Sequence, residues 1–291
     1  MREVYDCFMF YNEVEILQLR IRELYDSVDY FVIVEAKNKH QDGEERETVF
    51  DKIDKRKLSR YKDKIKYFQV GLEKTTPFDR ENEHRNKTYT CVRGLEPDDD
   101  DIILVSDLDE MPNKEKFDHA FRILDTGEPV VYFNQMYFVY FYNCYSGKNV
   151  TGTAATTFNT LRQIQSQNGF GPQTLRNNKD FRVHVDNGGW HFSYMGGANN
   201  IRLKSESIFD GIPASEEFFQ EQIEEAIRIK KSPYSNQDLV FLDPAIKDKQ
   251  IQSVDLRAGQ YYVNSNFTTL LPSEITKNNK RYEKYFHRES V

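Results

Sequence analysis

Residues 98–112 of the chain read DDDDIILVSDLDEMP, and this stretch decides the fold. Residues 102–105 form a short, continuous apolar run between polar neighbours, which is typical of a fully buried strand in an α/β sheet. Open α/β sheets bind their ligands in the crevice outside the carboxyl ends of the strands. Because Asp107, Asp109 and Glu110 follow this run directly, we expect them to lie at a ligand site.

The two aspartates are predicted to hold a divalent cation. Along a chain that stays extended until Pro112 ends the strand, alternate side chains point the same way, so Asp107 and Asp109 would face one ligand. Carboxylate oxygens suit a hard cation such as Mg²⁺ or Mn²⁺, which usually serves a phosphate group. A D-x-D triplet is common in proteins, so the hypothesis depends on its place at a strand end. The four acids at residues 98–101 are expected to form only a solvated turn.

The first part of the chain alternates strand-like and helix-like segments. Apolar runs with strand character occupy residues 4–10, 30–34 and 65–70. Helical spacing of apolar residues, or a charged segment with suitable start and stop residues, predicts helices over residues 13–24, 54–61 and 80–94. Strands that alternate with helices imply a mostly parallel sheet, so the predicted fold class is α/β.

The middle and last parts of the chain have a different character. Strands are predicted over residues 129–142, 181–185 and 188–194, and an amphipathic helix with Ser215 as its N-cap over residues 215–230. The interval 143–178 is rich in Asn, Gly and Thr, so we expect it to be loop-rich and to form an acceptor-side surface. Residues 259–291 are expected to form a strand and a loop laid back over the first half.

The composition restricts the class of protein. A chain of 291 residues with a net charge of -7 and no basic block is not expected to bind nucleic acid by neutralising phosphates. An anionic ligand would need a metal or a local basic cluster. The three widely spaced cysteines suit a reducing compartment. No secretory signal is recognised, and no apolar stretch approaches the roughly 18 residues needed to span a membrane. We therefore expect a soluble, cytoplasmic protein, either bacterial or viral in the host cytoplasm.

Several other residues could carry chemistry. Two glycines precede Trp190 and His191, and this arrangement predicts a sugar platform beside a metal ligand. Asn12, Glu13 and Glu35 follow the first two predicted strands, so a parallel sheet would bring them to the edge that carries the aspartates.

A basic cluster is predicted on the helix that precedes the acidic strand. Arg80, His84 and Arg85 share this helix, and Arg85 could pair with a diphosphate. Phosphate-binding loops of the G-x-x-x-x-G-K-[ST] and G-x-G-x-x-G types do not occur, which weakens the P-loop and dinucleotide-binding hypotheses.

Four blocks of the sequence together resemble glycosyltransferase family 17. They read DCFMFYNE at residues 6–13, VDYFVIVEA at 28–36, DIILVSDLDEMP at 101–112 and GWHFS at 189–193. The family's Thr-His-x-Gly motif after the second strand is replaced by residues 39–43, KHQDG, and the resemblance fades after about residue 210. The ordered blocks are far more specific than the D-x-D triplet alone.

The resemblance implies a GT-A, Rossmann-like glycosyltransferase fold with a smaller β-rich acceptor-side region. Residues 1–210 would form the catalytic core, divided into a nucleotide-sugar-binding half (1–112) and an acceptor-side half (113–210), with an appendage at 211–291. The donor would be a UDP-sugar, by default UDP-N-acetylglucosamine, and the acceptor a glycan. A Mn²⁺ or Mg²⁺ cofactor would bridge the diphosphate to the D-x-D motif.

The resemblance also gives residue-level expectations. Asp107 and Asp109 match the D-x-D pair, and His191 would complete the metal shell. Glu35 is expected near the nucleoside and Trp190 near a sugar. Inverting transfer needs a general base, for which Asp186 and Glu206 are the candidates.

Two other classes of protein stay open on the residues alone. A sugar nucleotidyltransferase also uses an acid pair with Mg²⁺, although it usually has a Gly-rich phosphate loop near its N-terminus. A non-catalytic carbohydrate-binding protein would explain the many aromatic residues, although it would not require the acid pair.

Overall fold

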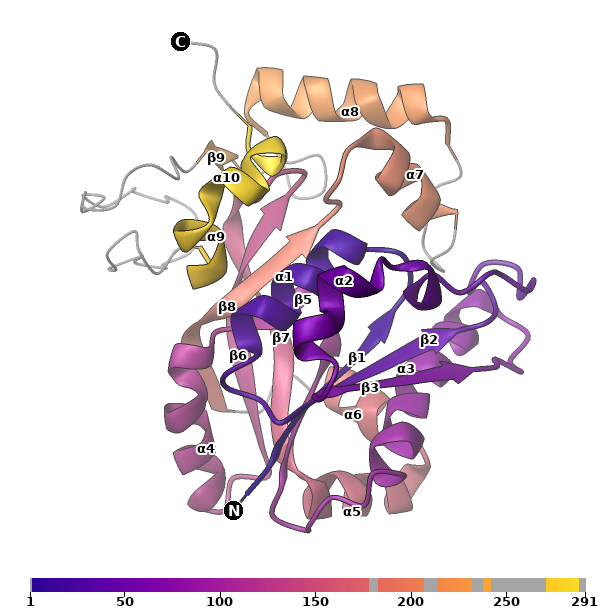
Figure 1. Ribbon diagram of the computed structural model, residues 1–291, viewed down its shortest axis with the longest axis vertical. Helices are drawn as coiled ribbons and strands as arrows, with labels where there is room; N and C mark the ends of the chain where they lie inside the picture. Colours follow the sequence, from indigo (N-terminus) through magenta and orange to yellow (C-terminus); the bar gives the residue numbers. More distant parts are fainter. Residues whose placement is uncertain (1, 178–182, 207–213, 232–237, 242–270, 288–291) are drawn as a thin grey trace.

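The computed structural model describes residues 2–177, 183–206, 214–231, 238–241 and 271–287. Within these residues, the strands form one mixed sheet in the order β3-β2-β1-β4-β7-β6-β8-β5, and β9 pairs with β7 (Figure 1). The strands are β1 (Val4–Phe10), β2 (Tyr30–Ala36), β3 (Ile65–Val70), β4 (Ile102–Asp107), β5 (Glu110–Pro112), β6 (Val130–Val139), β7 (Cys144–Thr157), β8 (Val183–Ser193) and β9 (Val240–Phe241).

The first half of the sheet is parallel, as the alternation of strands and helices predicts. β1 pairs in parallel with β2 and with β4, and β2 pairs in parallel with β3. The connecting helices are α1 (Val14–Leu24), a short α2 (Lys55–Leu58) and α3 (Pro77–Arg93). The carboxyl ends of β1, β2 and β4 therefore meet at one edge.

Alternation along the strands gives each face of the sheet its own core. In β1, Phe8 and Phe10 face the layer that contains α1, whereas Tyr5 and Cys7 face the layer that contains α3. The other strands of this half alternate in the same way, because a parallel sheet covered on both faces buries both sets of side chains. The result is a helix–sheet–helix sandwich.

The second half of the sheet is mixed. β7 runs antiparallel to β4 and to β6, whereas β8 runs parallel to β6 and antiparallel to the short β5. Four helices accompany these strands, namely α4 (Phe117–Asp125), α5 (Phe158–Asn168), α6 (Gly171–Asn177) and α7 (Ala198–Ser205). The expectation of a loop-rich interval at 143–178 is wrong up to residue 177, because β7, α5 and α6 occupy it. The polar residues of α5 lie largely on its solvent side, while Phe158 and Leu161 enter the core.

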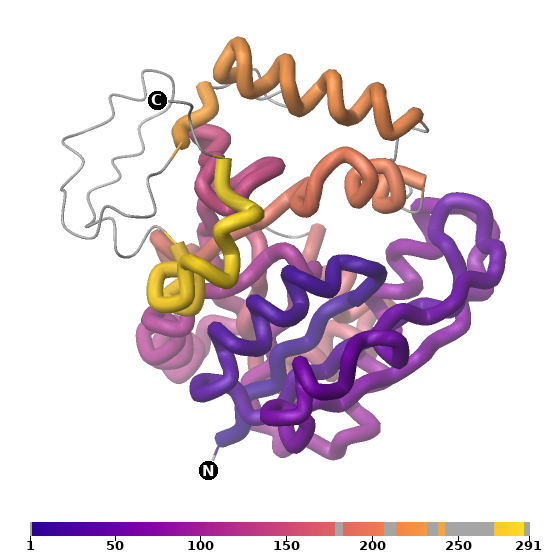
Figure 2. The backbone as a smooth tube through the Cα atoms, turned by 45° about the horizontal axis from the view of Figure 1, so that its top comes forward, coloured from indigo at the N-terminus to yellow at the C-terminus, as the bar shows by residue number. Residues whose placement is uncertain are grey.

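The last described elements pack on this framework. Helix α8 (Glu216–Ile229) begins at Ser215, whose side chain accepts a hydrogen bond from the backbone N–H of Phe218, so the predicted N-cap is confirmed. The segment with α9 (Ser273–Lys277), α10 (Asn279–Tyr282) and η5 (Glu283–Tyr285) is helical and lies beside α1 (Figure 2). The predicted tail strand is therefore not found in residues 271–287, and the rest of residues 259–291 lies outside the described chain.

Candidate functional site

The acidic stretch turns sharply after β4. β4 ends at Asp107, Leu108 and Asp109 form a turn, and Glu110 begins β5, which pairs with β8. The expectation that one strand continues to Pro112 is therefore wrong. Strand alternation therefore does not make Asp107 and Asp109 point the same way, because the chain is not extended between them.

A buried arginine explains why the chain turns here. The side chain of Arg20, on α1, is 0% exposed, and its Nη1 donates to the carbonyl oxygens of Asp107, Leu108 and Glu110 at 3.0, 3.0 and 3.1 Å. Its Nε and Nη2 bind the two carboxylate oxygens of Asp6 at 2.8 and 2.6 Å. A planar guanidinium with a fixed fork of donors suits this arrangement. Arg20 thus fixes the backbone of the turn from below.

The carboxylate of Asp107 lies between two arginines. Nη2 of Arg85, on α3, is 3.1 Å from Oδ1, and Nη2 of Arg176, on α6, is 3.1 Å from Oδ2. Burial alone would raise the pKa of Asp107, but the charges of Arg176 and Arg85 outweigh it and hold the pKa well below its usual range. Arg176 also pairs with the buried Glu110, which accepts a hydrogen bond from the backbone N–H of Asp107 at 3.1 Å.

The carboxylate of Asp109 faces a different set of nitrogen groups. Its Oδ2 lies 2.8 Å from Nζ of Lys204, on α7, and 3.6 Å from Nε2 of His191, on β8. Burial opposes ionisation here too, but Lys204 and His191 lower the pKa of Asp109 far below its ordinary value. Both carboxylates are therefore ionised at neutral pH, and each has its own positive partners.

Lys204 joins the acidic turn to the end of β1. Its Nζ lies 3.2 Å from Oε1 of Glu13. The other carboxylate oxygen of Glu13, Oε2, accepts a hydrogen bond from the backbone N–H of Asn12 at 3.2 Å. Burial would lower the pKa of Lys204, but Asp109 and Glu13 raise it well above its usual value. The structure thus brings Glu13 and Asn12 to the edge that carries the acid pair, as their positions after β1 predict.

The side chains of Glu35 and Trp190 are both buried in the interior of the protein. The carboxylate of Glu35 accepts hydrogen bonds from the backbone N–H groups of Val49 and Phe50 and pairs with Arg46, so it holds the loop after β2. Trp190 belongs to the core on the α1 side, where β8 pairs with β5. Their expected contacts with a nucleoside and a sugar stay predictions, and the structure supplies another reason for each side chain.

The candidate bases lie apart from the acid pair. Asp186 is exposed in β8, five residues before His191, and accepts a hydrogen bond from Asn134 at 3.1 Å. Glu206 is exposed at the end of α7 and pairs with Arg202. The structure does not pair either side chain with Asp107 or Asp109, and their catalytic role stays a prediction.

The basic helix α3 contributes differently from residue to residue. Arg85 pairs with Asp107. Arg80 instead donates to the backbone oxygens of His40 and Gln41, and the ring of His84 contacts the ring of His40 with their nitrogens 3.0 Å apart. Arg80 and His84 therefore support the loop after β2.

Two cations of the site, Arg176 and Lys204, have no signal in the sequence. Each is one basic residue in a segment that the sequence marks as polar, and only the packing of α6 and α7 against the strand ends brings them to the aspartates. Within the described ranges, no three His, Cys, Asp or Glu residues come close enough together to hold a metal ion by themselves. None of the described helices is long and apolar enough to cross a membrane.

A mixed α/β sheet with an acid pair at the carboxyl end of β4, the last strand of its parallel half, is consistent with a GT-A-like fold. The family model of glycosyltransferase family 17 matches residues 1–231, and the chain belongs to this family. It is therefore a glycosyltransferase, as the sequence blocks indicate. No curated protein sequence matches the chain.

Comparison with solved structures gives only distant similarity. The 4-diphosphocytidyl-2C-methyl-D-erythritolsynthase of Anaerococcus prevotii is 11% identical, with a TM-score of 0.42 over 77% of this chain and 96% of that chain. The bifunctional IspDF of Campylobacter jejuni is 10% identical, with a TM-score of 0.34 over 64% of this chain and 49% of that chain. These similarities carry no argument about activity.

Proposed function

We propose that the enzyme transfers a sugar, by default N-acetylglucosamine, from a UDP-sugar to a hydroxyl group of a glycan with inversion. The observation that carries the proposal is the ionised pair Asp107 and Asp109 at the carboxyl edge of the sheet, surrounded by Arg85, Arg176 and Lys204. A site that mixes fixed carboxylates with fixed cations suits a diphosphate and a divalent cation together.

The donor atoms of the acid pair fit Mn²⁺ or Mg²⁺. Such ions are usually held by one or two carboxylates together with substrate phosphates, so a cluster of three protein ligands is not required. Asp109 and Asp107 would hold the cation, which would neutralise the charge that develops on the departing diphosphate. His191 fits less well as a ligand, because its Nδ1 is buried without a partner among the described residues and metal-bound histidines usually donate from their second nitrogen.

The cations of the chain have a direct role in this proposal. A diphosphate that approaches Asp107 and Asp109 meets the guanidinium of Arg176 and the ammonium of Lys204, both of which already face the site. With a cation held by the carboxylates, Lys204 would be available to a phosphate oxygen. Positive groups that already face the site stabilise a leaving group because they need little reorganisation during the reaction.

Isothermal titration with UDP, in the presence and absence of Mn²⁺, tests the proposed donor site. The unchanged protein should bind UDP more tightly with Mn²⁺, and Asp109→Asn should reduce that affinity at least about tenfold, which corresponds to about 1.4 kcal/mol. Asp118→Asn changes an exposed aspartate of α4 and should bind UDP as the unchanged protein does. Metal-dependent UDP binding that survives Asp109→Asn would sink the site.

Turnover of a panel of UDP-sugars tests the reaction and the donor. Release of UDP from UDP-N-acetylglucosamine in the presence of glycan acceptors is the expected result. If the protein binds UDP but turns over none of the UDP-sugars, the donor class is wrong even though the nucleotide site is right.

A cytoplasmic location is part of the same proposal. The sequence argument for it is the cysteine usage, and Cys7, Cys91 and Cys144 are buried free thiols.

A further inference from the structure

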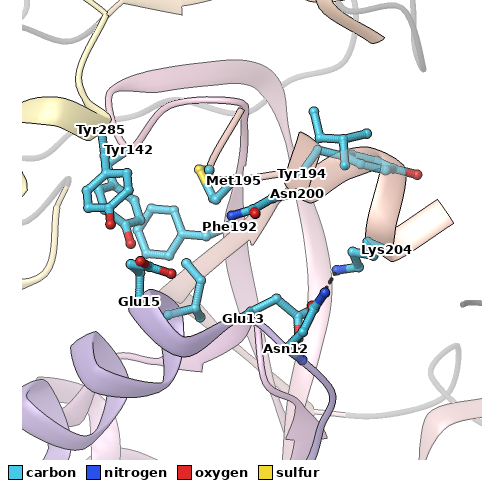
Figure 3. Close-up of a pocket in the computed structure, with 13 residues that line it drawn as sticks. Asn12, Glu13, Glu15, Tyr142, Phe192, Tyr194, Met195, Asn200, Lys204 and Tyr285 are labelled. Atoms are coloured by element: carbon cyan, nitrogen blue, oxygen red, sulfur yellow. Dashed lines mark hydrogen bonds and ion pairs between the residues drawn. The ribbon is translucent and has the colours of Figure 1, made fainter. Parts of the chain in front are cut away.

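A narrow pocket opens beside Lys204 and Glu13. Figure 3 shows that it lies between the start of α1, the end of β8, α7 and the C-terminal η5. Because Lys204 and Glu13 line this pocket and Lys204 also pairs with Asp109, the pocket adjoins the proposed diphosphate site. A group attached to the diphosphate, or one that attacks it, could therefore enter the pocket.

The pocket has one aromatic wall and one polar wall. Tyr142, Phe192 and Tyr285 form the aromatic wall, with the ring of Tyr142 edge-on to Phe192 at 5.0 Å and to Tyr285 at 5.3 Å. Glu15 and Asn200 contribute a carboxylate and an amide. An amphipathic ligand with C–H groups on one side and hydroxyl groups on the other matches these walls, and sugars have that character.

The hydroxyl group of Tyr142 is the most informative atom of the pocket. Tyr142 is 0% exposed, and its hydroxyl has no hydrogen-bond partner among the described residues. Burial raises the pKa of Tyr142 well above its usual value, so the hydroxyl stays protonated and can donate. In Figure 3 the hydroxyl groups of Tyr142 and Tyr285 both lie on the side of Glu15. Buried polar groups are almost always paired, so this one indicates a partner that the described residues do not provide.

The size of the enclosed space limits what that partner can be. The space measures about 20 Å³, more than the roughly 10–15 Å³ that one water molecule needs, so it admits a group of one or two heavy atoms and no sugar ring. We propose that the pocket receives the exocyclic hydroxymethyl group of a hexose, so that the enzyme selects hexoses over pentoses. The inference rests on the proposed function, and the hexose can be either the transferred sugar of the donor or the acceptor.

Two pairs of probes, each differing by a single hydroxymethyl group, test the proposal and separate the two sources. The first pair is UDP-glucose and UDP-xylose, whose affinities are measured by calorimetry in the presence of Mn²⁺. The second pair is methyl β-D-glucopyranoside and methyl β-D-xylopyranoside, whose binding is measured by ligand-observed NMR with and without UDP. A hexose preference of about tenfold is expected in one of the two pairs, and the pair that shows it identifies the source.

Tyr142→Phe tests the hydroxyl group directly, because it keeps the ring and its packing. It should reduce the hexose preference to about twofold or less while the affinities for UDP and for the pentose probes stay unchanged. Tyr61→Phe changes a partly buried tyrosine that packs against Tyr25 and does not line the pocket, so it is the matched control and should keep the preference. Circular dichroism verifies that both variants are folded.

Each outcome bears on one of the two proposals. Equal binding of hexose and pentose in both pairs, or a preference that Tyr142→Phe leaves unchanged, overturns the hydroxymethyl pocket and leaves a buried water as the partner of Tyr142. If UDP itself does not bind with Mn²⁺, the proposed function fails. The methyl glycosides measured without UDP then test the pocket for a free sugar, where a hexose preference keeps it and equal or absent binding overturns it.

Discussion

The parallel half and the mixed half of the sheet contribute to the acidic turn in different ways. The parallel half holds its backbone, because Arg20 of α1 binds three carbonyl oxygens of the turn and the carboxylate of Asp6. The mixed half supplies most of the charge that neutralises its side chains, through Arg176 of α6 and Lys204 of α7, and Arg85 of α3 supplies the rest. The shape of the site is thus built from fully buried contacts, whereas part of its charge comes from partners that a ligand can replace.

The largest effect is expected when the backbone support is removed. Arg20→Met leaves the carboxylate of Asp6 buried without a partner, and breaking a buried ion pair in this way costs about 3–5 kcal/mol. We expect the free energy of unfolding, measured by urea denaturation, to fall by about that amount. Arg22→Met removes a partly buried cation from the same helix and should cost less than about 1 kcal/mol.

The double variant sharpens the same test. Asp6→Asn combined with Arg20→Met removes the unpaired buried charge, so it should recover part of the lost stability. Equal stability of Arg20→Met and Arg22→Met would show that the turn holds its shape without Arg20, and the contrast between the two halves would then be lost.

The parallel half also contains a buried pair of histidines, which should make its stability depend on pH. Burial, followed by the charge of Arg85, lowers the pKa of His40 to about 4, and burial lowers the pKa of His84 well below its usual value. An unfolded histidine takes up a proton below about pH 6.5, while folded His40 stays neutral down to about pH 4. The unfolded state therefore binds more protons in this window, and stability falls as the pH falls. For His40 alone the loss is about 3 kcal/mol between pH 7 and pH 4.

Denaturant titrations at several pH values check this prediction. His40→Gln should flatten the fall in stability between about pH 6.5 and pH 4. His119→Gln replaces an exposed histidine of α4 and should keep the fall of the unchanged protein. If the His40→Gln profile coincides with that of the unchanged protein, folded His40 takes up its proton near the ordinary pKa and its burial has no energetic consequence.

The parallel half could be predicted from the sequence in greater detail than the mixed half. The strand predicted at residues 4–10 is found as β1 (Val4–Phe10), and the helix predicted at 80–94 is found as α3 (Pro77–Arg93). Fully buried strands have continuous apolar runs, so their positions can be recognised in the sequence alone. Helix α5 was missed because its apolar residues are few and its polar face suggests a loop.

The acid pair could likewise be predicted from the sequence in greater detail than the residues that surround it. Asp107 and Asp109 follow a recognisable strand, so their place at the sheet edge could be predicted. The turn between them could not, because Arg20 of another element holds it through its carbonyl oxygens. Lys204 is ordinary in sequence and becomes part of the site only through the tertiary packing of α7.

The smallest expected effect concerns the exchangeable charge. A cation that binds Oδ2 of Asp109 must replace the ammonium group of Lys204, which lies 2.8 Å from that oxygen and also pairs with Glu13. Lys204→Met removes this competitor, so the affinity for Mn²⁺ without nucleotide should rise about tenfold, or about 1.4 kcal/mol, as measured by the electron paramagnetic resonance of free Mn²⁺. Arg202→Met removes a cation of the same helix that pairs with Glu206 and should leave the affinity unchanged. Removing a cation that competes with Mn²⁺ for Asp109 must raise the affinity for Mn²⁺. If Mn²⁺ binds Lys204→Met no more tightly than the unchanged protein, Lys204 does not compete with the metal, and it is as permanent a part of the site as Arg20.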